Sequence, residues 1–238
     1  MKLISPKTFL SFILIGFSHL LISENQRLDR DPRDYRYTFV NLSHLSGSDQ
    51  SGLAIKASIN LPGSYYIVAE RLADGFDYKT ESYDKIIDSA RIGVQMGIGE
   101  VIGTISADRI SINVEDWFDV FLEIGVKNSE IEGKRFSFSK DNSQANALGG
   151  IRFGNSNSFE GKLYVDISKE TTVVETGEPV CQGISICPPY DVELSDASDT
   201  KFGIGFLYNI NRRSAVTFDV TSSNKIDNTF RIGYQINL

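Results

Sequence analysis

The sequence predicts an all-β protein, a closed antiparallel up-and-down β-barrel of the transmembrane kind. Many separate stretches alternate apolar and polar residues with a period of two, which indicates β-strands with one apolar face. The final stretch, TFRIGYQINL at residues 229–238, is itself such a strand. In lipid, an unpaired last strand would leave amides and carbonyls without hydrogen bonds. We therefore expect the last strand to close against the first.

The first 23 residues predict a secretory signal peptide. Lys2 and Lys7 precede an uncharged run at residues 9–22. As a helix rising about 1.5 Å per residue, that run falls short of a hydrocarbon core about 30 Å thick, which disfavours the alternative of a membrane anchor. We divide the chain into a signal peptide at 1–23, a short N-terminal periplasmic segment at 24–34 and an outer-membrane barrel at 35–238.

Composition limits the partners. The 238 residues are 41% hydrophobic and 23% charged, enough for one substantial folded domain. Removing residues 1–23 removes two lysines and no acidic residue, which leaves 22 basic against 31 acidic residues and a net charge of −9. An acidic protein of this kind is not expected to bind nucleic acid. No later stretch has about 18 consecutive apolar residues, so no transmembrane helix is predicted after the leader.

Ten strands are predicted, with a less regular alternation in the first and third. An even number places both ends of the barrel on the periplasmic side. Residues 99–116 leave the number open, because they alternate in part and could extend a strand, form another hairpin or fold in the periplasm; eight or twelve strands are the alternatives. The predicted strands are 35–45, 52–60, 64–73, 89–98, 117–127, 145–154, 159–169, 201–210, 214–222 and 229–238.

The connections between these strands are of two lengths. Short turns are predicted at 61–63, 154–158 and 211–213, and long polar loops at 74–88, 128–143 and 171–200. Tight turns at one end and long loops at the other are typical of outer-membrane barrels, whose turns face the periplasm.

The two faces of the strands distinguish a membrane barrel from a soluble β-sandwich, which would also alternate. Aromatic residues lie near the strand ends on the apolar face, and small residues accompany charges of both signs on the polar face, as in a filled lumen. Buried charges have to be paired, so we predict a lumen charge network. Its members are Lys56, Arg91, Asp119, Glu123, Lys127, Arg152, Lys162, Asp166, Asp219 and Arg231. The alternative, that paired carboxylates hydrolyse glycosides, explains the basic residues less simply.

Two motifs give the resemblance to a known class. The terminal strand TFRIGYQINL and the stretch VEDWFDVFLEIGV at 114–126 resemble the small outer-membrane β-barrel proteins of Gram-negative bacteria, the OmpA-like, OmpX-like and opacity-type group. The resemblance implies that the barrel assembly machinery recognises the last strand, although that pattern usually ends in Phe and this chain ends in Leu. The residues that would form this signal are Phe230, Ile232, Tyr234, Ile236 and Leu238.

Three further features could carry chemistry. Cys181 and Cys187, in CQGISIC, predict a disulfide in an oxidising compartment, with a metal site as the alternative. GIGEVIG at 97–103 has one residue too many for a dinucleotide fingerprint and no helix after it. His44 is the only histidine after residue 23 and would have to serve any lipid A-modifying activity, with Ser43 or Ser46 nearby.

We predict a non-enzymatic outer-membrane barrel that anchors acidic external loops for surface interaction or envelope integrity. A narrow porin-like channel, a lipid A-modifying enzyme and a soluble periplasmic binding barrel are the alternatives. Outer-membrane lipid, lipopolysaccharide, the barrel assembly machinery and an unidentified extracellular ligand are the expected partners. No cofactor or metal is expected.

Overall fold

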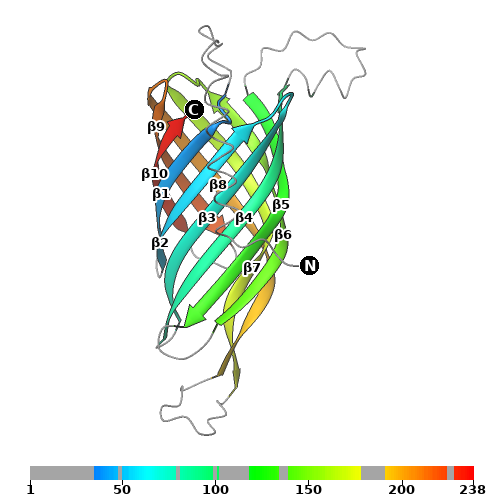
Figure 1. Cartoon of the computed structure of the whole chain (residues 1–238), viewed down its shortest axis with the longest axis vertical. Helices are drawn as coiled ribbons and strands as arrows, with labels where there is room; N and C mark the ends of the chain where they lie inside the picture. Colours follow the sequence, from blue (N-terminus) through cyan, green and yellow to red (C-terminus); the bar gives the residue numbers. More distant parts are fainter. Residues whose placement is uncertain are drawn as a thin grey trace.

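The computed structural model describes residues 35–47, 50–78, 81–98, 101, 118–133, 139–177, 191–223 and 228–238. In these ranges the chain forms a closed barrel of ten antiparallel strands, each paired with its two neighbours (Figure 1). The predicted fold class and strand number are confirmed. The strands are β1 (Phe39–Ser46), β2 (Gln50–Asn60), β3 (Tyr65–Tyr78), β4 (Glu81–Gly97), β5 (Phe118–Gly133), β6 (Ser139–Gly154), β7 (Phe159–Gly177), β8 (Asp191–Asn211), β9 (Ser214–Ser223) and β10 (Thr229–Asn237). Among the described residues, no helix is long and apolar enough to cross a bilayer.

The barrel closes between its first and last strands. β1 pairs with β10 from Phe39 opposite Asn237 to Ser46 opposite Phe230. One more backbone hydrogen bond, from the Leu238 N–H to the Thr38 carbonyl, extends this seam at 3.1 Å. Since β10 also pairs with β9, both of its edges are satisfied.

The two ends of the barrel differ. The short connections β2–β3, β6–β7 and β8–β9 lie at one end, together with the end of β10; we call it the turn end (Figure 1). Gly63 and Gly154 have φ of 82° and 104° there, a left-handed conformation that glycine adopts readily. The opposite end carries the tips of the long strand pairs, and we call it the hairpin end.

The three long loops predicted at 74–88, 128–143 and 171–200 are wrong for most of their length. The ladders continue to Tyr78 opposite Glu81, to Glu132 opposite Ser139 and to Gly177 opposite Asp191. A hairpin needs only backbone pairing and turn residues, and outside a lipid layer neither face has to be apolar. These segments therefore carry no period-two hydrophobic signal.

The predicted first strand, 35–45, is also wrong at its start. β1 begins only at Phe39. Residues 35–38, which we call the inner segment, precede it, and Tyr37 among them lines the lumen cavity. The Tyr35 and Tyr37 side chains are only 4% and 5% exposed and cluster with Tyr66 and Val68. Packing against Tyr66 and Val68 inside the lumen buries both rings.

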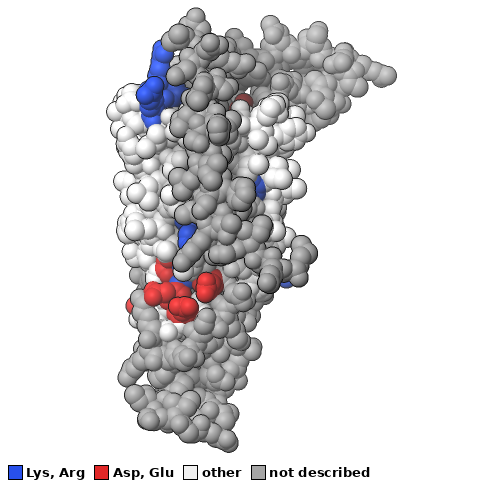
Figure 2. Space-filling view, in the orientation of Figure 1, with Lys and Arg blue, Asp and Glu red and all other residues white. Residues whose placement is uncertain are grey.

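The outer surface is apolar around the middle of the barrel. Large hydrophobic side chains from nearly every strand point outward, including Leu42, Ile124 and Ile232, each more than half exposed. Figure 2 shows a largely uncharged band on one face, with basic side chains near the turn end and acidic ones toward the hairpin end. Arg212 and Arg213 lie exposed in the β8–β9 turn. The outer surface thus has the character of a barrel wall that faces acyl chains.

Candidate functional site: the barrel lumen

A cavity of about 270 Å³, lined mostly by charged and polar residues, occupies the lumen. All ten strands contribute side chains to its wall. At the turn end these include Phe39 and Gln235, and at the hairpin end Asp74, Lys85 and Lys201. One water needs only ~10–15 Å³ of such space. The lumen is therefore large and polar enough to hold several waters.

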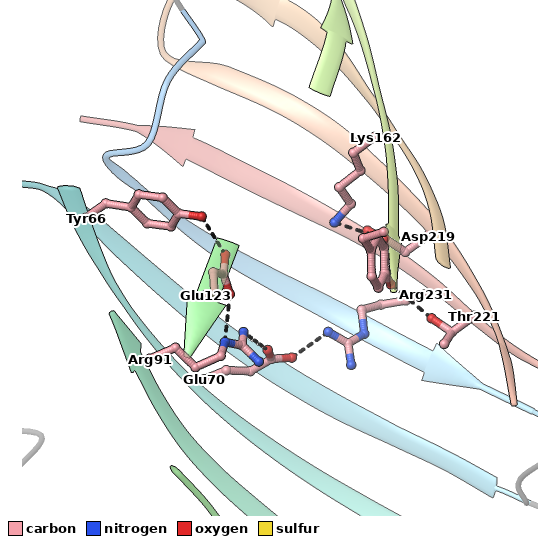
Figure 3. Close-up of polar contacts among 9 residues, drawn as sticks. Tyr66, Glu70, Arg91, Glu123, Lys162, Asp219, Thr221 and Arg231 are labelled. Carbon is pink, nitrogen blue, oxygen red and sulfur yellow. Dashed lines mark hydrogen bonds and ion pairs between the residues drawn. The ribbon is translucent and has the colours of Figure 1, made fainter. Parts of the chain in front are cut away.

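An ion-pair network crosses the middle of the lumen (Figure 3). The two Glu70 carboxylate oxygens contact two arginines: Oε2 lies 3.3 Å from Arg91 Nη2, and Oε1 lies 2.5 Å from Arg231 Nη1. Glu123 Oε2 lies 2.7 Å from Arg91 Nε. The Tyr66 hydroxyl donates to Glu123 Oε1 at 3.0 Å. We call Tyr66, Glu70, Arg91, Glu123 and Arg231 the mid-lumen network.

This network joins strands that are far apart in sequence. Glu70 on β3 links Arg91 on the adjacent β4 to Arg231 on β10. Arg91 and Glu123 are almost fully buried, each with a side-chain exposure of 6%. Removing either partner of such a pair would leave an uncompensated buried charge, which costs about 3–5 kcal/mol. The network therefore holds the barrel wall together across its lumen.

A second polar cluster lies beside Arg231, whose register partner is Asp219 (Figure 3). Lys162 Nζ on β7 lies 2.9 Å from Asp219 Oδ1 on β9. The Tyr164 hydroxyl is 3.3 Å from the same oxygen and 3.0 Å from Thr221 Oγ1. Lys162 Nζ also lies 5.0 Å from the centre of the Tyr164 ring.

Glycines on neighbouring strands make room for the lumen tyrosines. Tyr66 is paired with Gly93, and Tyr164 with Gly203. A Cβ atom on Gly93 would lie 2.2 Å from Tyr66 Cζ, and one on Gly203 would lie 2.0 Å from Tyr164 Cζ. Each ring therefore lies over its glycine, along the wall, where it shields the bare backbone and leaves the centre of the lumen open.

The inner segment narrows the turn end. The Arg152 guanidinium carbon lies 5.2 Å from the centre of the Tyr35 ring and 4.6 Å from that of Tyr37, and its Nη1 donates to the Arg36 carbonyl at 3.1 Å. Its Nη2 pairs with Glu160 Oε2 at 2.5 Å. The centres of the Tyr37 and Tyr66 rings lie 4.7 Å apart, so the inner segment also contacts the mid-lumen network.

Burial shifts the titration of these tyrosines. Desolvation, assisted by the carboxylates of Asp119 and Glu160, raises the pKa of Tyr35 to about 12. The pKa of Tyr37 is raised for the same main reason, against the opposing charge of Arg152. Both phenols stay neutral at physiological pH, so the inner segment adds no negative charge from its rings.

Amide side chains continue the polar lining at the turn end. Asn209 Nδ2 donates to Glu160 Oε1 at 3.1 Å, and Asn237 Nδ2 donates to Asn209 Oδ1 at 3.4 Å. Gln235 Nε2 donates to Asn237 Oδ1 at 2.7 Å. β7, β8 and β10 are thereby linked inside the lumen.

Nine of the ten residues predicted for the lumen charge network line the cavity. The tenth, Asp119, has the inward parity of β5 but does not line it. The structure joins Arg91 to Glu123 and Lys162 to Asp219, while Lys127 Nζ bonds the Lys169 carbonyl at 2.7 Å. The nine are Lys56, Arg91, Glu123, Lys127, Arg152, Lys162, Asp166, Asp219 and Arg231.

Sequence reasoning missed Glu70, Glu160 and the lumen tyrosines. Glu70 lies in the stretch 64–73, where Tyr65, Tyr66, Ile67 and Val68 follow one another and obscure the period of two. Glu160 follows a turn directly. In both places, pairing the strand with a neighbour whose alternation is clear would have shown which of its side chains point inward.

The other predicted chemical features separate in space or lie outside the described residues. Ser43 is buried on the lumen side of β1, whereas His44 and Ser46 are exposed on the outer face. Consecutive strand residues point to opposite faces, so Ser43 cannot meet His44 in a catalytic pair. The terminal-strand residues Phe230, Ile232, Tyr234 and Ile236 point outward. The signal peptide, Cys181, Cys187, residues 102–117 and most of GIGEVIG lie outside the described ranges.

Among the described residues, no group of three or more His, Cys, Asp or Glu side chains could hold a metal ion. The charged groups of the lumen contact one another or the cavity. Chemically, this arrangement offers charged and hydrogen-bonding side chains around an internal cavity.

Comparison with known proteins gives likeness in fold only. No family model and no curated protein matches the chain. Among solved structures, the KdgM porin has a TM-score of 0.42 at 9% identity, over 84% of this chain and 99% of that one. The NanC porin gives 0.35 at 10% identity over 84% and 99%. The translocator domain of the autotransporter NalP from Neisseria meningitidis gives 0.36 at 8% over 98% of both chains.

Proposed function

We propose that this protein is a narrow porin-like channel of a bacterial outer membrane that admits small charged solutes. The observation that carries the proposal is the polar cavity, lined by all ten strands and by side chains at both ends of the barrel, inside a wall whose outer face is apolar. A barrel that served only as an anchor would not need a cavity whose lining reaches both of its ends.

The size of the cavity limits the solute. At about 270 Å³ it is smaller than the ~300–1,000 Å³ of pockets that enclose drug-sized molecules. The mid-lumen network and the inner segment also occupy its cross-section. Inorganic ions and small carboxylates fit such a passage, and oligosaccharides do not.

Single-channel recording in planar lipid bilayers tests the channel. The purified full-length protein is expected to give discrete current steps in KCl. Ser89, which lines the cavity, and Ser222, which is exposed on the outer face, offer a matched pair. Ser89→Trp should lower the conductance, because the indole narrows the passage, and Ser222→Trp should leave it unchanged. Silence of the folded wild-type barrel at all voltages would contradict the proposal.

In that membrane the outer face of the barrel would contact lipid and lipopolysaccharide. The outward residues of β10, Phe230, Ile232, Tyr234 and Ile236, together with Leu238 after the strand, would act as the signal for the barrel assembly machinery.

A second function, display of a binding surface, rests on the β7–β8 pair. β6 pairs with β7 only as far as Ser168, and β9 pairs with β8 only from Lys201, whereas β7 and β8 stay paired to Gly177 opposite Asp191. A two-stranded ribbon therefore projects beyond the rim at the hairpin end (Figure 1). Replacing residues 170–198 by a short turn should abolish attachment to a cell or matrix ligand while the barrel still conducts. Unchanged attachment would exclude this role for the ribbon.

A further inference from the structure

We infer that the lumen selects anions over cations and that Lys56 is the residue that determines the selectivity. The inference rests on the proposed channel function and names its class of solute. It starts from a contrast of charge, since the whole chain is acidic, with a formal net charge of −7, but the cavity is not. Among the described residues, eight basic and six acidic side chains line it.

The surplus positive charge lies beside the mid-lumen network. Both oxygens of Glu70 are engaged by arginines, Oε1 by Arg231 and Oε2 by Arg91. Glu123 is engaged by Arg91 through Oε2 and by the Tyr66 hydroxyl through Oε1. Each of the four carboxylate oxygens of Glu70 and Glu123 thus already faces an arginine or the Tyr66 hydroxyl.

Lys56 is the cation that remains. It lies on β2, directly opposite Glu70 in the register, and its side chain lines the cavity. Among the described residues, no hydrogen bond or direct ion pair joins its ammonium group to a partner, and the charged groups that act on it electrostatically are Glu123, Lys162, Arg91 and Glu70. Counting the mid-lumen network with Lys56 gives three cations against two carboxylates.

Lys162 does not add to this surplus, because Asp219 neutralises it over Gly205 on the strand between them. An ammonium group without a carboxylate partner, in a narrow passage with walls of low dielectric constant, attracts anions and repels cations much more strongly than it would in bulk water. A chloride ion or a small carboxylate passing Lys56 would supply the missing partner. The local charge around Lys56, more than the acidic chain as a whole, sets which ion crosses.

Reversal potentials in planar bilayers separate the possibilities, with KCl more concentrated on one side of the membrane. The reversal potential of the wild type is expected to lie between zero and the equilibrium potential of chloride. Lys56→Gln should move the reversal potential toward zero. Lys56→Glu should move it further, toward the equilibrium potential of potassium. Lys56→Arg should keep the wild-type value. Arg71→Gln is the control, because it removes a positive charge from the outer face of the barrel. Arg71 Nη1 lies there 3.5 Å from Asp88 Oδ2.

Each variant is first checked for a folded barrel by its heat-dependent migration in electrophoresis. A wild type that conducts with cation preference or without preference would overturn the inference and leave the channel function standing. The inference is also overturned if Lys56→Gln and Lys56→Glu conduct with an unchanged reversal potential. A folded protein that carries no current at all would overturn the channel function and the anion preference with it.

Discussion

At the scale of single residues, the lumen depends on pairs in which a bare glycine faces a flat aromatic ring. Tyr66 covers Gly93 and at the same time donates its hydroxyl to Glu123. The ring is held at its edge by Tyr37 and at its tip by Glu123, so it has little freedom to move away. The glycine thus decides where a member of the mid-lumen network can lie.

We predict that Gly93→Ala destabilises the barrel by about 1–3 kcal/mol, because the new methyl group overlaps Tyr66 Cζ and forces the ring off the wall. The midpoint of urea unfolding in detergent measures this. Gly75→Ala is the control, since its Cβ would meet Asp84 Oδ1 at an ordinary 3.7 Å. Equal midpoints for Gly93→Ala and wild type would show that the ring can move without cost.

The mid-lumen network could be predicted only in part at this scale. Arg91, Glu123 and Arg231 follow from clear alternation in their strands, since inward polar positions read directly from the period of two. Glu70 does not, because its strand has apolar residues on both faces: Tyr66, Val68 and Leu72 point inward and Ile67 points outward. Glu70, which links Arg91 to Arg231, could therefore not be placed in the lumen without the register of its strand.

At the scale of elements, the inner segment is an irregular piece of chain where the sequence predicts a strand. It is held by Arg152, which stacks on both of its tyrosines and bonds its backbone. Because this segment lies inside the turn end and contacts the mid-lumen network through Tyr37, it reduces the cross-section available to solutes.

We predict that Tyr37→Ala raises single-channel conductance, because removing the ring opens space beside Tyr66 and Arg152. Tyr65→Ala, on the outer face, should leave conductance unchanged. The measurement is the current step size in planar bilayers. The segment would have no role in limiting conductance if Tyr37→Ala, folded as judged by electrophoresis, gave the wild-type step size.

At the scale of the whole molecule, closure is the dominant constraint. The outer face carries the apolar side chains, and the polar ones point inward, the reverse of a soluble protein with an apolar core. Such a surface is stable only against lipid or detergent. The β1–β10 seam removes the last unpaired edge.

We predict that the folded protein remains with the outer-membrane fraction, needs detergent for extraction and migrates differently in electrophoresis before and after boiling, because a closed barrel resists unfolding by the detergent at room temperature. Cell fractionation and paired electrophoresis measure this. Release by osmotic shock, or a folded monodisperse sample in plain buffer, would contradict the assignment of the apolar belt to lipid.

Period-two alternation is a local property of the chain, so it was enough to predict the class of fold and the inward or outward direction of most strand side chains, while it left eight or twelve strands as alternatives to ten. The closed barrel was needed to show which inward charges meet, where the inner segment lies and how far the hairpins extend. Contacts between β3 and β10 or between Arg152 and Tyr37 depend on register and closure, which are set by all ten strands together. The unpaired position of Lys56 follows from the same cause: its nearest carboxylates are engaged by arginines from other strands.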